Sequence, residues 1–144
     1  MISIDYISKE ESLVLIEKVK NPKYKTLILL MLDCGLRVSE TVTLKLKNFD
    51  FQKRTLTVRS MKKRNEEYRT IPISDRLYRQ LANYLESCKI KINDGENFLF
   101  PSYTEKGHLC RKTVWRVLSR YGHNLNIQNL HPHTLRHTFA THHL

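Results

Sequence analysis

The sequence lacks the features of membrane and secreted proteins. Its longest apolar run, residues 27–32, is far shorter than the roughly 20 residues that a transmembrane helix needs. The N-terminus has no basic region followed by a long apolar region, so no secretory signal is expected. The three cysteines, Cys34, Cys88 and Cys110, are odd in number and widely spaced, which predicts neither a disulfide framework nor a paired metal site. We therefore expect a protein of the reducing cytoplasm with no membrane association.

Glycine and proline are also scarce, with only four of each among 144 residues. Linkers between domains are often rich in these residues, and the sequence contains no such stretch, no internal repeat and no low-complexity segment. The chain is long enough for one domain with a substantial core and too short for two comfortable ones. One continuous domain over residues 1–144 is therefore expected.

Acidic side chains are missing from the end of the chain, since Glu105 is the last of them. The whole chain has 25 lysines and arginines against 14 aspartates and glutamates, a formal net charge of +11. A domain this basic attracts phosphate backbones and binds them with strong salt dependence. A second basic cluster contains Lys53, Arg54, Arg59, Lys62, Lys63, Arg64 and Arg69. These charges favour nucleic acid as the partner, and a solvated basic surface that binds any polyanion is the alternative.

Local patterns predict a mostly helical chain. A helix from Ser8 to about Val19 has a capping box formed by Ser8 and Glu11. A buried helix over residues 24–34 follows Asn21-Pro22, and Gly35 can end it with a positive φ angle. Further helices are expected at 37–44, from residue 74 onward, at 111–121 and from residue 132 toward the end. The residues expected to face inward in two of these are Leu77, Leu81, Tyr84 and Leu85, and Val114, Trp115 and Leu118.

Three short segments, residues 49–51, 55–61 and 68–73, predict strands because apolar and polar residues alternate or cluster there. The polar stretch 62–67 is then expected to be the tip of a hairpin. The expected fold class is mainly α (α+β), with one small three-stranded antiparallel sheet.

Three segments carry a resemblance to a known family. They are residues 34–40 (CGLRVSE), 68–73 (YRTIPI) and 131–142 (HPHTLRHTFATH). In their order and expected settings they resemble the first catalytic arginine motif, the lysine hairpin and the His-x-x-Arg motif of the tyrosine recombinases, or phage-integrase family, of the Xer-like kind. The resemblance covers nearly the whole chain, and its third motif is the most specific. It implies the helical catalytic-domain fold of that family and the function of a site-specific DNA recombinase or integrase.

The resemblance implies that Arg37 and Arg136 hold the scissile phosphate. Two guanidinium groups, each a rigid fork of donors, suit the negative charge that the phosphate gains when it becomes five-coordinate. Glu40 lies one helical turn after Arg37 and is expected to orient it. On this first motif alone, a surface Arg–Glu pair without function is an equally good interpretation.

His133 and Arg136 are three residues apart on one expected helix, so they share a face near its N-terminus, where an anion is favoured. A histidine there can bond a phosphate oxygen or act as general base for the nucleophile. His137 is expected to orient its neighbours without touching the phosphate. The competing interpretation is a capping histidine beside an incidental arginine, which the length of the matching run disfavours.

The family also uses a hairpin lysine as the general acid for the leaving 5′-oxygen. Its commonest pattern, Gly-Lys-Gly, is replaced here by residues 60–65 (SMKKRN). Counting back from residues 69–72 favours Lys63, Lys62 is the alternative, and a cluster that only contacts the DNA backbone competes with both. The residues expected to bind DNA are Lys62, Arg64, Arg111, Lys112 and Arg116.

The family site has two further parts after the His-x-x-Arg helix, a histidine or tryptophan and the tyrosine nucleophile. The sequence ends at Leu144, and all seven tyrosines precede that motif, so none is assigned as nucleophile and Tyr84 is expected in the core. The expectation is a catalytic domain over 1–144 without the C-terminal segment and the N-terminal core-binding domain, which binds DNA but does not cut it alone. In the intact protein, strands would be cleaved and rejoined through a 3′-phosphotyrosyl intermediate. Because this covalent bond conserves energy, no ATP or metal is required.

A zinc site is an alternative for His133 and His137, which have the i, i+4 spacing of helical zinc ligands. The residues between them are Thr-Leu-Arg, with no glutamate, and a guanidinium beside a dication is unfavourable. A zinc site would also need a third ligand and supporting partners. We therefore expect no metal and no other cofactor.

A non-catalytic DNA-binding remnant of a recombinase is the alternative function. The reading frame beyond Leu144 discriminates, because a continuation with a tyrosine supports the enzyme and a stop codon supports the remnant. Double-stranded DNA is the expected partner, with a monomer in free solution and a tetramer on DNA in the intact protein. The target site stays open, as does the choice among chromosome resolution, phage integration and transposition.

Overall fold

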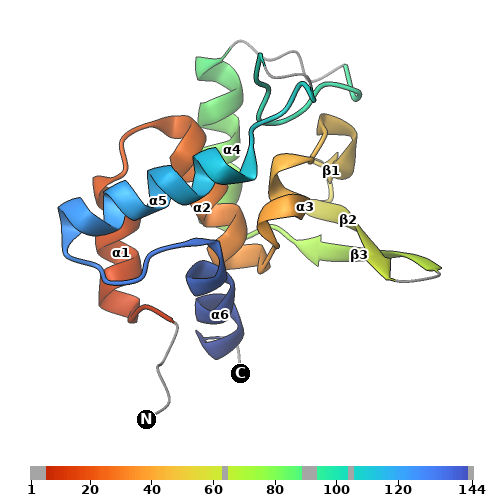
Figure 1. Cartoon of the computed structure of the whole chain (residues 1–144). Coiled ribbons are helices and arrows are strands. Elements are labelled where there is room, and N and C mark those ends of the chain that lie inside the picture. The colour runs from red at the N-terminus through yellow and green to blue at the C-terminus, as the bar shows by residue number, and fades with distance from the viewer. Residues whose placement is uncertain (1–5, 63–64, 89–93, 104–105, 143–144) are drawn as a thin grey trace.

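The computed structural model describes residues 6–62, 65–88, 94–103 and 106–142, without the side chains of 60–62 and 65–66. Its helices are α1 (Lys9–Lys18), α2 (Pro22–Cys34), α3 (Val38–Val42), α4 (Asp75–Ser87), α5 (Arg111–Leu125) and α6 (Pro132–His142), with the short 3-10 helix η1 (Leu46–Asn48). Strands β1 (Phe49–Asp50), β2 (Thr55–Lys62) and β3 (Asn65–Pro72) form an antiparallel sheet in the order β1-β2-β3. The expected helical fold with one small sheet is confirmed (Figure 1). No helix in these described ranges is long and apolar enough to cross a membrane.

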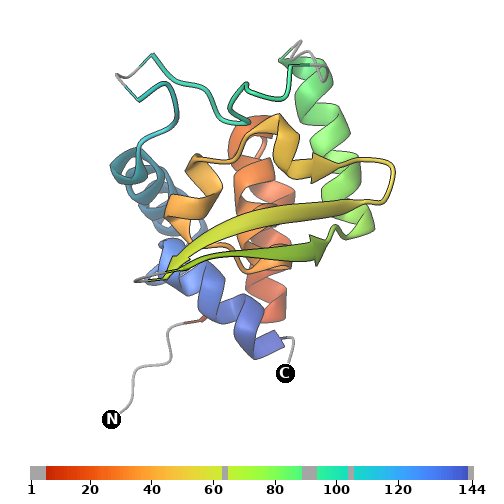
Figure 2. The same cartoon turned by 90° about the vertical axis from the view of Figure 1, so that its right-hand side faces the viewer.

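Helix α2 is the central element, because α1, α3, α4 and α6 all contact it. The sheet and α1 lie on opposite sides of it (Figures 1 and 2). Its buried residues are Thr26, Leu27, Ile28, Leu29, Leu30, Met31, Leu32 and Cys34. The helix begins after Asn21, whose side chain accepts a hydrogen bond from the Lys23 N–H, and it ends at Gly35, as the sequence predicts.

A close contact between α2 and α6 depends on Gly35. Its φ angle is 66°, in the left-handed region that favours glycine. A Cβ atom at this position would overlap the aromatic ring of Phe139, so the ring occupies the space that a side chain would need. The absence of that side chain lets α6 pack against the end of α2. The turn that leads into Arg37 therefore lies next to the helix that carries His133 and Arg136.

The start of the described chain is tied to the same helix. The Ile7 N–H donates to the Thr138 hydroxyl at 3.0 Å, and both residues are buried. Helix α1 then begins with the predicted capping box, since the Ser8 side chain accepts from the Glu11 N–H and the Glu11 carboxylate accepts from the Ser8 N–H. These contacts hold α6 between the N-terminal segment and α2.

The β2–β3 hairpin is longer than the sequence predicts. Its pairing runs from Thr55 and Pro72 to Lys62 and Asn65, whereas the expected hairpin tip covered 62–67 and the third strand was expected only from Tyr68. That prediction was wrong because it treated a charged stretch as a loop. Main-chain hydrogen bonds between strands do not require apolar side chains, and solvent-facing strands tolerate charge.

Helix α4 covers the core with the apolar face that its sequence predicts. The buried residues of this helix are Leu77, Gln80, Leu81, Tyr84 and Leu85. The Tyr84 hydroxyl donates to the Leu99 carbonyl at 2.8 Å, which confirms that this tyrosine is a core residue. The Asp33 carboxylate accepts from the Ser74 hydroxyl at 2.6 Å and from Arg76 Nε at 2.8 Å. These bonds connect the end of α2 to the start of α4.

Candidate functional site

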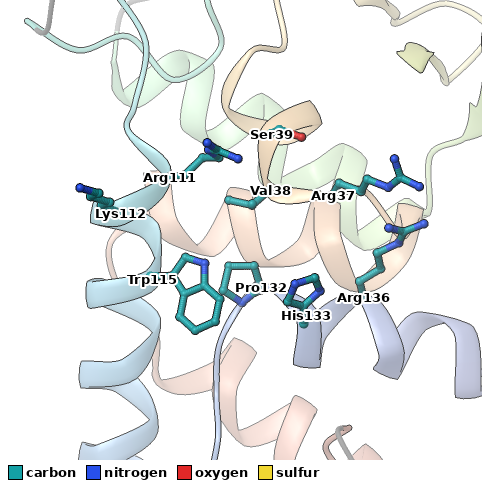
Figure 3. Close-up of a pocket in the computed structure, with 9 residues that line it drawn as sticks. All are labelled: Arg37, Val38, Ser39, Arg111, Lys112, Trp115, Pro132, His133 and Arg136. Atoms are coloured by element: carbon teal, nitrogen blue, oxygen red, sulfur yellow. The ribbon is translucent and has the colours of Figure 1, made fainter. Parts of the chain in front are cut away.

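A pocket of about 490 Å³ lies where α3, α5 and α6 meet (Figure 3). Its lining residues are Arg37, Val38, Ser39, Arg111, Lys112, Trp115, Pro132, His133 and Arg136. Four of these nine residues are arginines or lysines, and none is acidic. A concave site with this charge favours an anion, and guanidinium groups favour one with several oxygens. The pocket therefore fits a phosphate group.

Arg37 reaches the pocket from the N-cap position of α3. Its main-chain N–H donates to Glu40 Oε1 at 2.8 Å, and its carbonyl accepts from the Thr41 hydroxyl at 2.9 Å. Because both main-chain groups are bonded, the exposed guanidinium extends from a fixed point. Figure 3 shows it beside the guanidinium of Arg136, which comes from α6.

Glu40 connects the Arg37 turn to the sheet. Its side chain is only 8% exposed, and the carboxylate accepts hydrogen bonds from both terminal nitrogens of Arg69 at 3.0 Å. The sequence spacing predicts that Glu40 lies beside Arg37, whereas nothing in the sequence singles out Arg69 as a site residue. That Glu40 orients Arg37 during a reaction stays a prediction, for which its bond to the Arg37 N–H is the relevant contact.

His133 and Arg136 both line the pocket from the first turns of α6. This helix begins at Pro132, as expected from the sequence. Burial lowers the pKa of Arg136 below its ordinary value, the nearby Arg37 and Arg69 lower it further, and Glu40 opposes the shift. The charged form of Arg136 is thus less stable here than in water. Because an arginine nevertheless stays protonated near neutral pH, an anion between Arg37 and Arg136 would relieve this repulsion.

Trp115 is a pocket residue that the sequence analysis placed wrongly. We expected it to face inward with Val114 and Leu118, which are buried, but its side chain is 40% exposed and lines the pocket. A spacing signal was available, because residue 115 lies four positions after Arg111 and three after Lys112. Those positions share one helix face. The hydrophobicity of Trp115 favours a position in the core, whereas its spacing from Arg111 and Lys112 favours the basic face of α5.

His137 lies next to the pocket without lining it. Its ring centroid is 6.5 Å from that of His133, and its role in orienting neighbours stays a prediction. Within the residues that the structure describes, no group of three or more histidines, cysteines, aspartates and glutamates is arranged to hold a metal ion.

The residues expected to bind DNA separate into three groups. Arg111 and Lys112 line the pocket at the start of α5, whereas Arg116 is exposed on the same helix and is not a lining residue. The main chain of Lys62 pairs with Asn65 at the end of the hairpin. The side chain of Lys62, and all of Lys63 and Arg64, lie outside the described residues, so the candidate general acid is not placed.

Residues 5–144 match the model of the phage integrase family. The chain is 39% identical over 140 residues to tyrosine recombinase XerA of Pyrococcus furiosus, a match that covers 94% of this chain and 46% of that protein. It is 33% identical over 140 residues to a tyrosine recombinase of Pseudothermotoga lettingae, covering 96% of this chain and 46% of the relative. The chain thus spans about half the length of these curated relatives.

Solved structures share the fold. The crystal structure of XerA recombinase superposes with a TM-score of 0.81 at 27% identity, covering 98% of this chain and 49% of that one. The integrase from mycobacterium phage Brujita has a TM-score of 0.74 at 23% identity, covering 98% of this chain and 45% of that one, and supports the fold alone. The family match spans almost every residue, including those around the arginine pocket, and the chain therefore belongs to the phage integrase family, which includes the tyrosine recombinases.

Proposed function

We propose that this chain forms the phosphate-binding part of the active site of a site-specific DNA recombinase or integrase. One observation carries the proposal: Arg37 from the start of α3 and both His133 and Arg136 from α6 line the same pocket. Arg37 is far from His133 and Arg136 in the sequence, and none of the nine described residues that line the shared pocket carries a carboxylate that would compete with an anion. The substrate would be a phosphodiester of double-stranded DNA.

Arg37 and Arg136 would hold the two non-bridging oxygens of the scissile phosphate. Their combined charge stabilises the five-coordinate transition state more than the ground state, because negative charge on these oxygens grows as the nucleophile attacks. The pKa of Arg136, lowered by burial and by its arginine neighbours, is consistent with a site that is most stable when an anion is bound. Glu40 would keep the Arg37 main chain in place during this step.

The remaining proton transfers would use His133 and Lys63. A tyrosine oxygen of the intact protein attacks phosphorus, His133 accepts its proton or bonds a phosphate oxygen, and the bond from phosphorus to the 5′-oxygen breaks. Lys63, with Lys62 as the alternative, donates the proton that makes the leaving group a 5′-hydroxyl. The 3′-phosphotyrosyl bond conserves the energy of the phosphodiester, so the reverse reaction can rejoin a strand without ATP or a metal ion.

No tyrosine is among the residues that line the pocket. We therefore expect this chain by itself to bind DNA without forming a covalent adduct. Arg111 and Lys112 would contact the DNA backbone beside the pocket, with Arg116 on the same helix. The XerH recombinase, whose solved structure is a complex with its difH substrate, has this fold with a TM-score of 0.72 at 22% identity. In the cytoplasm, the intact protein would be a monomer when free and a tetramer on DNA.

The binding step is tested by measuring the affinity of the chain for a duplex oligonucleotide and for heparin at matched salt concentrations. Arg37→Ala and Arg136→Ala should weaken duplex binding, because each removes a phosphate contact. Arg79→Ala is the matched control, since it removes one charge from an exposed position on α4 outside the pocket. Equal affinity for heparin and duplex DNA would instead support a general polyanion-binding surface.

The chemical step is tested in a protein that joins this chain to a tyrosine-bearing C-terminal segment of the family. Covalent adducts with nicked DNA are trapped and quantified on denaturing gels. Arg37→Ala and Arg136→Ala should each reduce adduct formation by about 10²–10³-fold, the usual effect of removing one oxyanion donor. Unchanged adduct formation in both variants would refute the assignment. Tight DNA binding with no adduct in any form would support the non-catalytic alternative.

A further inference from the structure

Trp115 lines the pocket but has no role in the mechanism proposed above. We infer that its indole ring is a positioning group that fixes the imidazole of His133 in the orientation that contacts the phosphate. This inference rests on the proposed function, because it assumes that a phosphate binds beside Arg37 and Arg136. Trp115 would then be a functional residue of the pocket that comes from α5.

The first observation is a direct ring contact between α5 and α6. The rings of Trp115 and His133 have centroids 6.4 Å apart and an interplanar angle of 76°, an edge-to-face arrangement. This distance lies within the range in which aromatic pairs attract each other. His133 is exposed, so the surrounding core does not hold its ring. An exposed side chain in a first helical turn otherwise samples several rotamers.

The second observation is a parallel stack between the rings of Trp115 and His131, which lies two positions before His133. Trp115 and His131 have ring centroids 4.6 Å apart with an interplanar angle of only 10°. The His131 carbonyl accepts the first hydrogen bonds of α6, from the Thr134 N–H at 3.0 Å and from the Leu135 N–H at 3.3 Å. By stacking on His131, Trp115 therefore also anchors the residue at which α6 starts, two positions before His133.

The other ring neighbours of His133 belong to its own segment. The His131 ring lies 6.1 Å away at 82°, and the His137 ring lies 6.5 Å away at 69°. His131 directly precedes α6 and His137 lies on it, so both belong to the same segment as His133 and do not connect its ring to another helix. Among the described ring contacts of His133, Trp115 provides the one from another helix. Trp115 therefore connects the imidazole of His133 to α5, a second helix that lines the pocket.

An uncharged positioning group suits the electrostatics of this pocket. A histidine is often oriented by a carboxylate, but a carboxylate that lined this pocket would compete with the phosphate for the guanidiniums of Arg37 and Arg136. Glu40, the carboxylate near these arginines, is not among the lining residues and is paired with Arg69. An indole ring holds the imidazole through its quadrupole and shape and adds no net charge. The basic residues Arg111 and Lys112, one turn before Trp115, therefore keep their full effect on an incoming anion.

The test uses the chain as it stands, with inorganic phosphate as the probe. Ring signals of His133 and the Nε signal of Arg136 are followed by 1H–15N NMR during a phosphate titration of the wild type, Trp115→Leu, Trp115→Phe and Tyr6→Leu. Tyr6 is the matched control, because it is also 40% exposed and meets a histidine ring, that of His142, edge-on at 6.4 Å. Thermal unfolding identifies the variants that remain folded.

Trp115→Leu should weaken phosphate binding about fivefold, the effect of losing one to two aromatic contacts, and should reduce the response of the His133 ring more than that of Arg136. Trp115→Phe should restore most of the response, because it retains a ring at the same position. Tyr6→Leu should match the wild type. A His133 response in folded Trp115→Leu that equals the wild-type response would overturn the inference.

A second measurement needs no variant. Trp115 is the only tryptophan in the chain, so the intrinsic tryptophan emission comes from the pocket. The emission should change with the same phosphate dependence as the His133 signals, and constant emission while those signals move would overturn the inference even if Trp115→Leu does not fold. Failure of the proposed function looks different, since phosphate would then leave both His133 and Arg136 unchanged in the wild type.

Discussion

Glu40 and Arg69 form a bidentate ion pair that connects α3 to β3, with both N–O distances at 3.0 Å. The Glu40 side chain is 8% exposed and the Arg69 side chain is 40% exposed, so the pair lies at the edge of the core. The same carboxylate accepts from the Arg37 main-chain N–H. The hairpin that carries the candidate lysines is therefore attached to the turn that carries the first candidate phosphate ligand.

Breaking this pair should destabilise the protein. Arg69→Ala leaves a nearly buried carboxylate without its bidentate partner, which should cost about 1–3 kcal/mol of unfolding free energy. Glu40→Ala should cost a similar amount, and the double variant should cost less than the sum, as urea unfolding can measure. Lys47→Ala, which removes one end of an exposed pair with Glu96, should change stability by less than about 1 kcal/mol. Strict additivity of the two single changes would show that the pair is not coupled.

Gly35→Ala should destabilise the protein more than a substitution at another positive-φ glycine. Gly35 has a φ of 66°, and a Cβ added there would overlap the Phe139 ring. Gly107 has a φ of 75°, but a Cβ added there would lie 3.5 Å from the Phe98 ring, which is an ordinary van der Waals contact. Both variants lose the left-handed preference of glycine, at roughly 1 kcal/mol. Gly35→Ala should lose about 1–3 kcal/mol more through overpacking against α6. Equal melting temperatures for the two variants would contradict the close approach of α2 and α6.

DNA binding should depend steeply on salt, with a slope set by the number of phosphate contacts. Arg111→Ala and Lys112→Ala should each reduce the slope of log K against log [salt] by about one, because both residues line the pocket where the backbone would pass. Arg116→Ala tests whether the contact continues along α5 beyond the pocket. Fluorescence anisotropy with a labelled duplex gives the slopes, and Arg79→Ala should leave the slope unchanged. The same slope for all four variants would mean that α5 does not contact DNA.

The cysteines should differ in reactivity toward iodoacetamide. The main-chain N–H groups of Lys112 and Thr113 at the start of α5 lower the pKa of Cys110, whereas burial and the nearby Asp33 raise the pKa of Cys34 to about 12. A lower pKa increases the thiolate fraction at neutral pH and a higher one decreases it. Cys110 should therefore be alkylated first at pH 7, and buried Cys34 should react only on unfolding.

A Cys88→Ser variant retains only these two thiols, and mass spectrometry compares their rates of alkylation. Duplex DNA should slow the alkylation of Cys110, since it directly precedes Arg111 and Lys112 at the start of α5. If Cys34 in the folded protein reacts as fast as Cys110, the result would contradict the burial of Cys34 at the end of α2. If DNA gives no protection, the start of α5 lies outside the DNA interface.

Relations within about four residues could be read from the sequence. The Ser8–Glu11 capping box, the left-handed turn at Gly35 and the start of α6 at Pro132 were all predicted, because each depends on local backbone geometry. His133 and Arg136 were also predictable as neighbours on one face, since residues three apart on a helix lie next to each other. The hairpin was predicted too short because side-chain polarity is a poor guide to main-chain pairing at a sheet edge.

By itself, the sequence therefore determined the helices, their caps and the spacing of the candidate phosphate ligands. Only the tertiary structure decided that the guanidiniums of Arg37 and Arg136 lie side by side in one pocket, that Arg69 pairs with Glu40, and that Trp115 leaves the core to stack on His131 (Figure 3). The physical reason is the range of the interactions. A helix sets its own spacing through bonds between near neighbours, whereas contacts between helices depend on how buried side chains such as Phe139 pack against a distant glycine.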